Sequence, residues 1–367
     1  MEYSLISAIS ATAVSCILLI TFFNFFTIRQ LKSSQSNQSQ IIHAKVSILI
    51  PMRDEFENAQ AVLETALKQK NLADFEVIVR DDQSTDRTLE VLRQISDDHL
   101  SVQCGSSLPE GWIGKSYALA KLAEQASGDY LVFLDADVRL SDGAIAASIS
   151  LLEELNLDYI SPYPRQLVGD WLSGIVQPLL QWSWFATLPI RITEKSRKPS
   201  TAVANGQFLI VKRSAYLKSG GHESIKSEVI EDMELARNLR IHGFRGTVVE
   251  GSQIATCNMY QTFSELFFGY AKSQWRAFGS ILGAVLVMSV MILTSLIPLI
   301  AASMNDYLGI YGYLALVLSR ILVAFKTKSN YWSAIFHPIA ILIWISIICT
   351  SIILKQMGLL KWRGRSI

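Results

Sequence analysis

The chain has 367 residues, which is enough for a core of roughly 200–250 residues plus membrane segments. Hydrophobic residues make up 50% and charged residues 18%, which is below the roughly 25% charge of ordinary soluble domains. The formal net charge of +1 gives no overall field that attracts nucleic acid, so we expect no nucleic-acid partner. Four cysteines, none in a CxxC pair, predict neither a disulfide framework nor a zinc site.

A long apolar segment at residues 5–28 opens the chain, with only Ser, Thr and one Asn as polar interruptions. As a helix it would extend roughly 36 Å, which is enough to cross a bilayer. No Lys or Arg precedes it, and it is too long for a signal peptide. Arg29 and Lys32 follow directly, so the positive-inside bias predicts a cytoplasmic chain after Arg29. We predict a membrane anchor over residues 1–32; the alternative is a buried core helix.

Strands and helices alternate after a polar stretch at residues 33–45, which predicts a flexible tether. Predicted strands cover residues 46–50, 75–79, 100–103 and 130–134, and predicted helices cover 55–68, 85–95 and 115–126. This alternation predicts an α/β domain over residues 46–261 with a mostly parallel sheet and right-handed crossovers. The strand at 130–134 is apolar throughout, so we expect it at the centre.

Acidic residues follow three of these strands at the point where each strand ends. The first strand is followed by Asp54 and Glu55, the second by Asp81 and Asp82, and the fourth by Asp135 and Asp137. The carboxyl ends of parallel strands meet at one edge of a sheet, and ligands bind there. Clustered carboxylates are costly without a cation, and Mg²⁺ and Mn²⁺ favour carboxylate and phosphate oxygens. The sequence therefore predicts a divalent cation at this edge.

Two further segments have sequences typical of a membrane interface. Residues 170–190 are apolar, contain three tryptophans and are flanked by basic residues, which predicts an interfacial helix; the alternative is a buried core helix. Residues 262–280 mix aromatic residues with Lys272 and Arg276, which predicts a second, amphipathic interface helix.

Glu231 and Asp232 precede a segment with Leu235 and Leu239 on one face and Gly243 behind it, which predicts a helix with a glycine at its end. Carboxylates in a first helical turn are favoured by the macrodipole, so the pair could be structural only. The same dipole would keep Asp232 ionised.

Residues 281–367 hold three more apolar runs, at 281–304, 307–325 and 334–354, followed by a basic tail. Three crossings would place that tail outside, whereas its charges favour the inside, so two or three spans are possible. Arg320 interrupts the second run. An arginine in mid-membrane is costly unless it pairs or snorkels, so this run is the weakest candidate for a membrane span. We expect a multi-pass protein of the plasma membrane whose α/β domain is cytoplasmic.

These motifs together resemble family 2 glycosyltransferases, which have the GT-A fold. The matching elements are SILIPMRDE at residues 47–55, DDQSTD at 81–86, DAD at 135–137 and the pair at 231–232. PEGWIGK at 109–115, ANGQF at 204–208, GGH at 220–222 and WRGR at 362–365 are similar to the subgroup that acts on carotenoid or hopanoid lipids. Ceramide glucosyltransferases also carry the last of these motifs.

The resemblance implies a role for each matched position. Asp82 would bind the base of a nucleotide-sugar donor, expected to be uracil, with Asp81 in support. Asp137 would hold the divalent cation, and Asp135 would bind ribose or a metal-bound water. Asp232, or else Glu231, would be the general base of an inverting transfer. Further donor-binding positions are expected at Pro51, Arg53, Glu55, Lys115 and Asn205, and His222 could contact the acceptor or a phosphate.

The acceptor is expected to be a membrane lipid, a carotenoid or other isoprenoid. The run Gln274-Trp275-Arg276 departs from the Gln-x-x-Arg-Trp of processive synthases, so we expect one transfer per acceptor. Three alternatives stay open: a polyprenyl-phosphate sugar transferase, a non-catalytic membrane subunit that keeps the fold, and a transporter.

Overall fold

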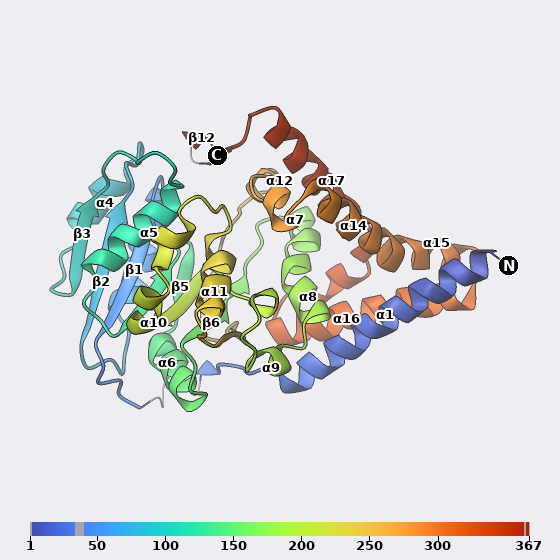
Figure 1. Cartoon of the computed structure of the whole chain (residues 1–367), viewed down its shortest axis with the longest axis horizontal. Coiled ribbons are helices and arrows are strands. Elements are labelled where there is room, and N and C mark those ends of the chain that lie inside the picture. Colours follow the sequence, from blue (N-terminus) through green and yellow to red (C-terminus); the bar gives the residue numbers. More distant parts are fainter. Residues whose placement is uncertain (1, 34–39, 363–364, 367) are drawn as a thin grey trace. The chain divides into compact units, whose positions relative to one another are not determined.

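A computed structural model describes residues 2–33, 40–362 and 365–366 (Figure 1). The chain forms two compact units that are not consecutive in sequence. The first combines Met1–Ile28, Gln166–Arg191 and Met259–Ile367, and the second combines Arg29–Arg165 and Ile192–Asn258. The predicted domain at 46–261 thus differs from the observed division, because its segment 166–191 belongs to the helical first unit. Residues 34–39 of the predicted tether lie outside the described residues, and Ile42 in its remainder forms a bridge with Leu72.

A seven-stranded sheet forms the centre of the second unit, as far as the described residues extend. Its order is β3 (Leu100–Cys104), β2 (Phe75–Asp81), β1 (Val46–Met52), β4 (Tyr130–Leu134), β8 (Phe208–Lys212), β6 (Tyr159–Tyr163) and β9 (Gly246–Glu250). Strand β8 is antiparallel to β4 and β6, and the other pairs are parallel. The α/β fold with a mostly parallel sheet is confirmed, with β4 at its centre.

The helices of the second unit pack on this sheet and on one another. They are α3 (Phe56–Leu67), α4 (Thr88–Gln94), α5 (Gly114–Gln125), α6 (Ala144–Glu154), α10 (Arg213–Lys218) and α11 (Glu231–Ile241), with 3-10 turns η1 (Pro199–Thr201) and η2 (Gly221–Ile225). Leucines of α5 and α11, among them Leu122 and Leu235, share one buried cluster with Phe133 and Tyr159 of the sheet. Apolar burial of this kind contributes most of the stability of such a layer.

Two predictions about local structure have different outcomes. The helix after Ile230 is confirmed, and Gly243 behind it has φ +87°, where a residue with a side chain would be strained. His222 is not in an open loop: it is buried, its Nδ1 lies 2.9 Å from the Tyr216 hydroxyl, and burial lowers its pKa to about 4. It therefore packs in the core, within electrostatic reach of Glu231 and Lys115, and its contact with an acceptor or phosphate stays a prediction.

The first unit contains long apolar helices, which Figure 1 shows with labels α1 and α14 to α17. They are α1 (Glu2–Thr27), α14 (Ile281–Met291), η3 (Ile292–Leu296), α15 (Ile297–Ser303), α16 (Tyr307–Thr327) and α17 (His337–Gln356). Four stretches of the described chain are long and apolar enough to cross a membrane: Leu5–Thr27, Ile281–Ser303, Tyr307–Thr327 and His337–Gln356. The C-terminal region thus supplies three candidate spans.

The second candidate span is irregular at its middle. Segment η3 is a π-helix just before Pro298, because proline lacks an N–H and its ring clashes with the carbonyl four residues earlier. Gly309 of α16 allows a close approach to α15, since a Cβ there would lie 2.5 Å from the Cβ of Ala301.

Arg320 lies inside the first unit and is 2% exposed. Its guanidinium lies 3.4 Å from Nδ1 of His337 and donates to the Ile175 carbonyl and to the Ser333 hydroxyl at 3.4 and 3.3 Å. These polar contacts explain how an apolar helix accommodates the charge.

Residues 170–190 form two short helices in place of the single interfacial helix expected. These are α7 (Trp171–Val176) and α8 (Pro178–Thr187), followed by α9 (Ile190–Thr193). Pro178 begins α8 because a proline fits the first turn of a helix but not its interior. Trp182 and Trp184 are buried, and Trp182 donates to the Ser319 hydroxyl at 2.8 Å, so this part of the segment packs inside the first unit.

The predicted amphipathic helix at 262–280 is likewise two helices, α12 (Phe263–Ala271) and α13 (Gln274–Ala277). The remaining elements are β5 (Val138–Leu140), β7 (Arg165–Gln166), β10 (Ala255–Cys257), η4 (Tyr331–Ala334), β11 (Lys361–Trp362) and β12 (Arg365–Ser366). Residues 363–364 of the closing WRGR motif lie outside the described residues.

Candidate active site

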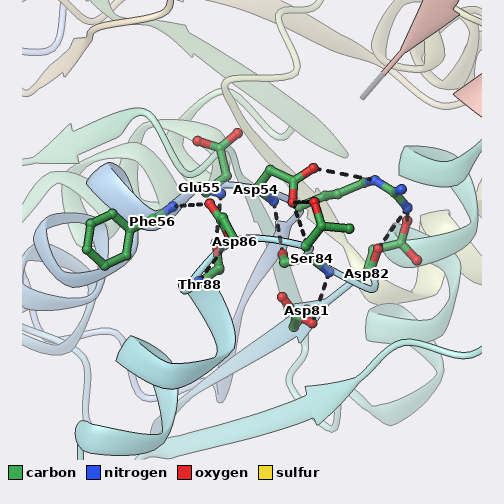
Figure 2. A network of polar contacts seen from close by, with 10 residues as sticks. Asp54, Glu55, Phe56, Asp81, Asp82, Ser84, Asp86 and Thr88 are labelled. Carbon is green, nitrogen blue, oxygen red and sulfur yellow. Dashed lines mark hydrogen bonds and ion pairs between the residues drawn. The ribbon is translucent and has the colours of Figure 1, made fainter. Parts of the chain in front are cut away.

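The loops after β1 and β2 are joined by hydrogen bonds into one rim (Figure 2). The Asp82 amide donates to the Met52 carbonyl at 2.7 Å, which continues the register of the two strands. Asp54, at φ +53°, accepts from the Thr85 amide at 2.7 Å, and its own amide donates to Ser84 Oγ at 2.9 Å. Aspartate tolerates this left-handed conformation better than most residues, so the sequence suits the turn.

A second set of bonds fixes the start of α3 against the start of α4, and Figure 2 shows it beside the first. The Glu55 amide donates to Thr88 Oγ1 at 2.8 Å, and the Phe56 amide donates to Asp86 Oδ2 at 3.1 Å. Asp86 also accepts from the Thr88 amide at 2.9 Å, which explains why α4 begins three residues later than predicted.

The candidate base-binding residues lie at the end of β2. Asp82 is 2% exposed, and Arg53 donates to its carbonyl at 3.0 Å. Asp81 is also buried; its Oδ2 accepts from the Ser84 amide at 3.3 Å. Pro51 pairs with Arg80 of β2, beyond the last pairing of β1 with β4 at Leu49. The missing N–H of this proline therefore interrupts no ladder bond to β4.

Asp135 and Asp137 follow β4 directly, as the sequence predicts. No hydrogen-bond donor within the described chain reaches Oδ1 of Asp137, and this atom is shielded from solvent. Burial, the Asp135 carboxylate and the Glu55 carboxylate raise the pKa of Asp137 to about 7. A buried carboxylate oxygen that lacks a donor and lies among other acids fits a divalent cation.

Cys257 is a residue that the sequence analysis did not connect to this site. It is buried in β10 and pairs with Val138 of β5, next to Asp137. Its thiol interacts electrostatically with the Asp137 carboxyl, and the Asn258 amide donates to the Asp137 carbonyl at 3.1 Å. Burial and the charge of Asp137 hold the pKa of the thiol well above its ordinary value, so it stays protonated and can donate. No motif in the sequence points to this pairing.

Lys115 links the metal-side carboxylates to helix α11. Its Nζ lies 2.8 Å from Oδ1 of Asp135 and 2.8 Å from Oε1 of Glu231. Burial alone would lower the pKa of the ammonium, but the two carboxylates outweigh it and hold that pKa well above the ordinary value. Lys115 also lowers the pKa of Glu231, against the effect of burial. Glu231 is therefore the counter-ion of a lysine, which makes it a poor proton acceptor.

Asp232 is held by backbone amides on both of its oxygens. Oδ2 accepts from the Gly206 amide at 2.7 Å and Oδ1 from the Met233 amide at 2.8 Å. Burial and the Glu231 carboxylate raise its pKa to about 6, against the opposing effect of Lys115. Burial and the Glu231 charge thus outweigh the helix dipole in setting this pKa, but the predicted ionised form still prevails at neutral pH. The pKa still lies below neutral, where a general base is effective.

Asn205 precedes Gly206 in the turn that faces Asp232. Its side-chain amide donates to Oε1 of Gln207 at 3.0 Å and accepts from the Gln207 amide at 3.0 Å. The Gln207 carbonyl in turn accepts from the Asp135 amide at 3.1 Å. Asn205 therefore shapes a turn between the two acidic centres, and its role in donor binding stays a prediction.

No group of three or more His, Cys, Asp or Glu side chains in the described residues is arranged to hold a metal ion. A cation at Asp137 would need further oxygens, and a diphosphate is the ligand that completes such a shell in nucleotide enzymes. The residues present therefore fit a metal that arrives with a donor.

The fold and this acidic rim define a GT-A-like domain. A solved mannosyltransferase from Pyrobaculum calidifontis, in complex with GDP-Man and Mn2+, is similar at a TM-score of 0.58 and 15% identity, covering 97% of this chain and 99% of that one. At that identity the likeness shows the fold alone.

The family model described as "Glycosyl transferase family 2" matches residues 47–220. This match covers a little under half of the chain, so residues 47–220 are similar to glycosyl transferase family 2. Curated relatives named 4,4'-diaponeurosporenoate glycosyltransferase are 28% identical: that of Staphylococcus haemolyticus over 62% of this chain and 60% of its own length, and that of Staphylococcus aureus strain USA300 over 63% and 60%. The matched region thus spans about three-fifths of those relatives.

Proposed function

We propose that this chain is an inverting glycosyltransferase that moves one sugar from a nucleotide-sugar donor, a UDP-sugar, to a lipid acceptor in the plasma membrane. The observation that carries this proposal is the buried Oδ1 of Asp137 beside Asp135 and Glu55, at the strand edge where Asp81 and Asp82 also lie. Such an edge suits a nucleoside diphosphate with its cation.

The donor would be held by residues that the rim already orders. Asp82 would accept a hydrogen bond from the base, with Asp81 and Arg53 fixing its position. Asp137 and Asp135 would hold Mg²⁺ or Mn²⁺. When bound, this cation supplies the positive charge that neutralises the leaving diphosphate. Pro51, Glu55 and Asn205 would contribute to the donor site through the turns that they shape.

Asp232 would take the proton from the acceptor hydroxyl as that oxygen attacks the anomeric carbon, in a single displacement with inversion. The two backbone amides on its carboxylate fix its orientation, and its pKa of about 6 leaves it mostly ionised at neutral pH. Lys115, held by Asp135 and Glu231, would face the diphosphate as a point charge. Glu231 would then be a positioning residue for Lys115, contrary to its placement as an alternative base.

The named relatives favour a carotenoid acid as acceptor, and the four apolar helices of the first unit favour a lipid that resides in the membrane. We therefore propose a carotenoid or another isoprenoid. Arg29 and Lys32 after the first candidate span favour a multi-pass protein of the plasma membrane whose second unit is cytoplasmic, with access to nucleotide sugars.

The purified full chain in lipid nanodiscs tests this proposal. It would be incubated with each of several UDP- and GDP-sugars, Mn²⁺ and a carotenoid acid, a carotenoid alcohol or a polyprenyl phosphate, and lipid products would be identified by mass spectrometry. A glycosylated carotenoid that is absent with Asp137→Ala supports the proposal. If only the polyprenyl phosphate is glycosylated, the acceptor is a polyprenyl phosphate and not a carotenoid. If no combination of donor and acceptor gives a product, a catalytic role is contradicted.

A further inference from the structure

A basic segment at residues 195–198 lies on the second unit, where the chain has just left the helices of the first. The cations Lys195, Arg197 and Lys198 are exposed, and no carboxylate of the described chain lies within ion-pair distance of their side chains. Ile192, just before them, is 64% exposed. Three cations within four residues give this part of the surface the positive charge that attracts anionic lipid.

Two contacts place the start of this segment at the end of the first candidate span. Asn24, in the last turn of α1, accepts from the Ile190 amide at 3.0 Å and donates to the Leu188 carbonyl at 2.6 Å. Arg29, two residues beyond α1, donates to Oε1 of Glu194 at 2.9 Å. If α1 crosses a bilayer, the basic segment therefore follows within a few residues of the membrane surface.

A buried arginine binds the backbone at Lys198, in the segment, and at Thr193, just before it. Arg240 of α11 is 2% exposed and donates to the carbonyls of Thr193 and Lys198 at 3.3 and 3.4 Å. The Ser196 amide also donates to the Thr193 carbonyl at 2.9 Å. The carbonyl groups thus bind inward while the three cationic side chains stay exposed. Glu194, the acid just before the segment, is paired with Arg29 and does not neutralise the three cations.

We propose that Lys195, Arg197 and Lys198 form a binding surface for the anionic headgroups of membrane phospholipids, with Ile192 contacting the acyl boundary. Juxtamembrane cations of this kind attract anionic lipid, and each contributes about five-fold in affinity, so three contribute about a hundred-fold at low salt. This inference concerns the lipid surface and does not depend on the transferase chemistry.

The full chain in detergent tests the proposal by titration with phosphatidylglycerol or with phosphatidylcholine of the same acyl chains, counting bound lipids by native mass spectrometry. The variant is Lys195→Gln/Arg197→Gln/Lys198→Gln. The matched control is Lys68→Gln/Arg93→Gln/Lys218→Gln, which removes the same charge from exposed positions on or next to α3, α4 and α10. Thermal unfolding of both variants verifies that they are folded.

We expect the variant to lose up to about a hundred-fold in affinity for phosphatidylglycerol and nothing for phosphatidylcholine, while the control keeps both. Added salt should weaken the wild type toward the variant. Equal phosphatidylglycerol affinity in wild type and variant would overturn the proposal. So would an equal loss in the control, or displacement of the lipid by soluble glycerol phosphate at the same concentration, since the surface would then recognise charge without a membrane.

Discussion

Lys115 Nζ lies 2.8 Å from Oε1 of Glu231, and this ion pair connects the first turn of α5 to the first turn of α11. Because Asp232 is the next residue, both members of the pair act on its carboxyl. The Glu231 charge raises the pKa of Asp232, and the Lys115 charge lowers it. Removing the Glu231 charge should therefore lower the pKa of Asp232, and removing the Lys115 charge should raise it.

We expect the acid limb of the pH–rate profile to move in opposite directions in two variants. The transfer rate of the wild type should fall as pH drops through about 6, because the base loses its ionised form there. Glu231→Gln should move that limb to lower pH, and Lys115→Met should move it to higher pH. The measurement is kcat against pH for the three proteins at saturating donor.

Each variant has its own further consequence. Lys115→Met should also raise the KM for the donor, since the diphosphate loses a point charge. Asp97→Asn, at an exposed position on the loop between α4 and β3, is a control that should leave the profile unchanged. A limb that stays in place in both variants would show that the pair does not act on the base.

The acids at the sheet edge should lower the stability of the metal-free protein at high pH. In the folded state the pKa of Asp137 is about 7, against an ordinary value near 4, so folding favours the protonated form. Stability from this group is therefore lost as pH rises from about 4 to about 7. Asp137→Asn removes the effect and should stabilise the fold by on the order of 1–3 kcal/mol at about pH 8, with little change at about pH 4.

Scanning fluorimetry in the presence of UDP, with and without Mn²⁺, measures this difference. The cation should raise the Tm of the wild type at high pH and leave that of Asp137→Asn unchanged, because the variant offers one anionic ligand fewer. Transfer should be lost in the variant. An equal Mn²⁺ response in both proteins would place the cation elsewhere.

Cys257 should matter to the cation through Asp137. Its protonated thiol can donate to the Asp137 carboxyl, so Cys257→Ala removes one restraint on that side chain, whereas Cys257→Ser keeps a donor. We expect Mn²⁺ affinity, measured by calorimetry, to fall about ten-fold or more in the alanine variant and less in the serine variant. Equal affinity in all three proteins would reduce Cys257 to a packing residue of β10.

The sequence predicts the elements that depend on local pattern and misses those that depend on distant pairing. The strand at Tyr130–Leu134 and the two acids after it follow from apolar run and motif, and both are observed in place. Cys257 reaches Asp137 only because β10 pairs with β5, a contact between residues 120 positions apart that no periodicity encodes. The Lys115–Glu231 ion pair could not be predicted either, because its two residues are also far apart in the sequence.

One wrong prediction had a local signal. Pro178 marks a helix start, so an uninterrupted helix over 170–190 conflicts with the preference of proline for a first turn. The raised pKa of Asp232 had no such signal, because its burial and its distance from Glu231 are unknown before the fold.

Labelling of a cysteine thiol by a membrane-impermeant reagent reports the orientation of the protein in the membrane. Cys104 is exposed on the second unit, and we expect it to be out of reach of a membrane-impermeant maleimide in intact cells, since Arg29 and Lys32 predict a cytoplasmic location. A Ser33→Cys variant in a Cys104→Ser background should behave alike. Both should react once the membrane is permeabilised. Labelling of intact cells would reverse the orientation and exclude cytoplasmic nucleotide sugars as donors.

The identity of the acceptor should appear in the size of one mutational effect. Asp232→Asn keeps the shape of the side chain and removes its basicity. An alcohol must lose its proton as it attacks, so turnover on a carotenoid alcohol should fall by roughly 10²–10⁴-fold, while donor affinity hardly changes. A carotenoid acid is already ionised at neutral pH, so on that acceptor the loss should be small and reflect positioning.

The pH profile on the two acceptors separates these cases further. With an alcohol, the wild-type rate should show the limb near pH 6 that Asp232 sets. With an acid, the carboxylate of the acceptor sets the limb, and Asp232→Asn should not remove it. Because the Gly206 and Met233 amides both donate to Asp232, the asparagine variant leaves one amide facing an N–H₂ group, so a modest loss is expected on either acceptor. Full activity of Asp232→Asn on an alcohol would assign the proton transfer to another group.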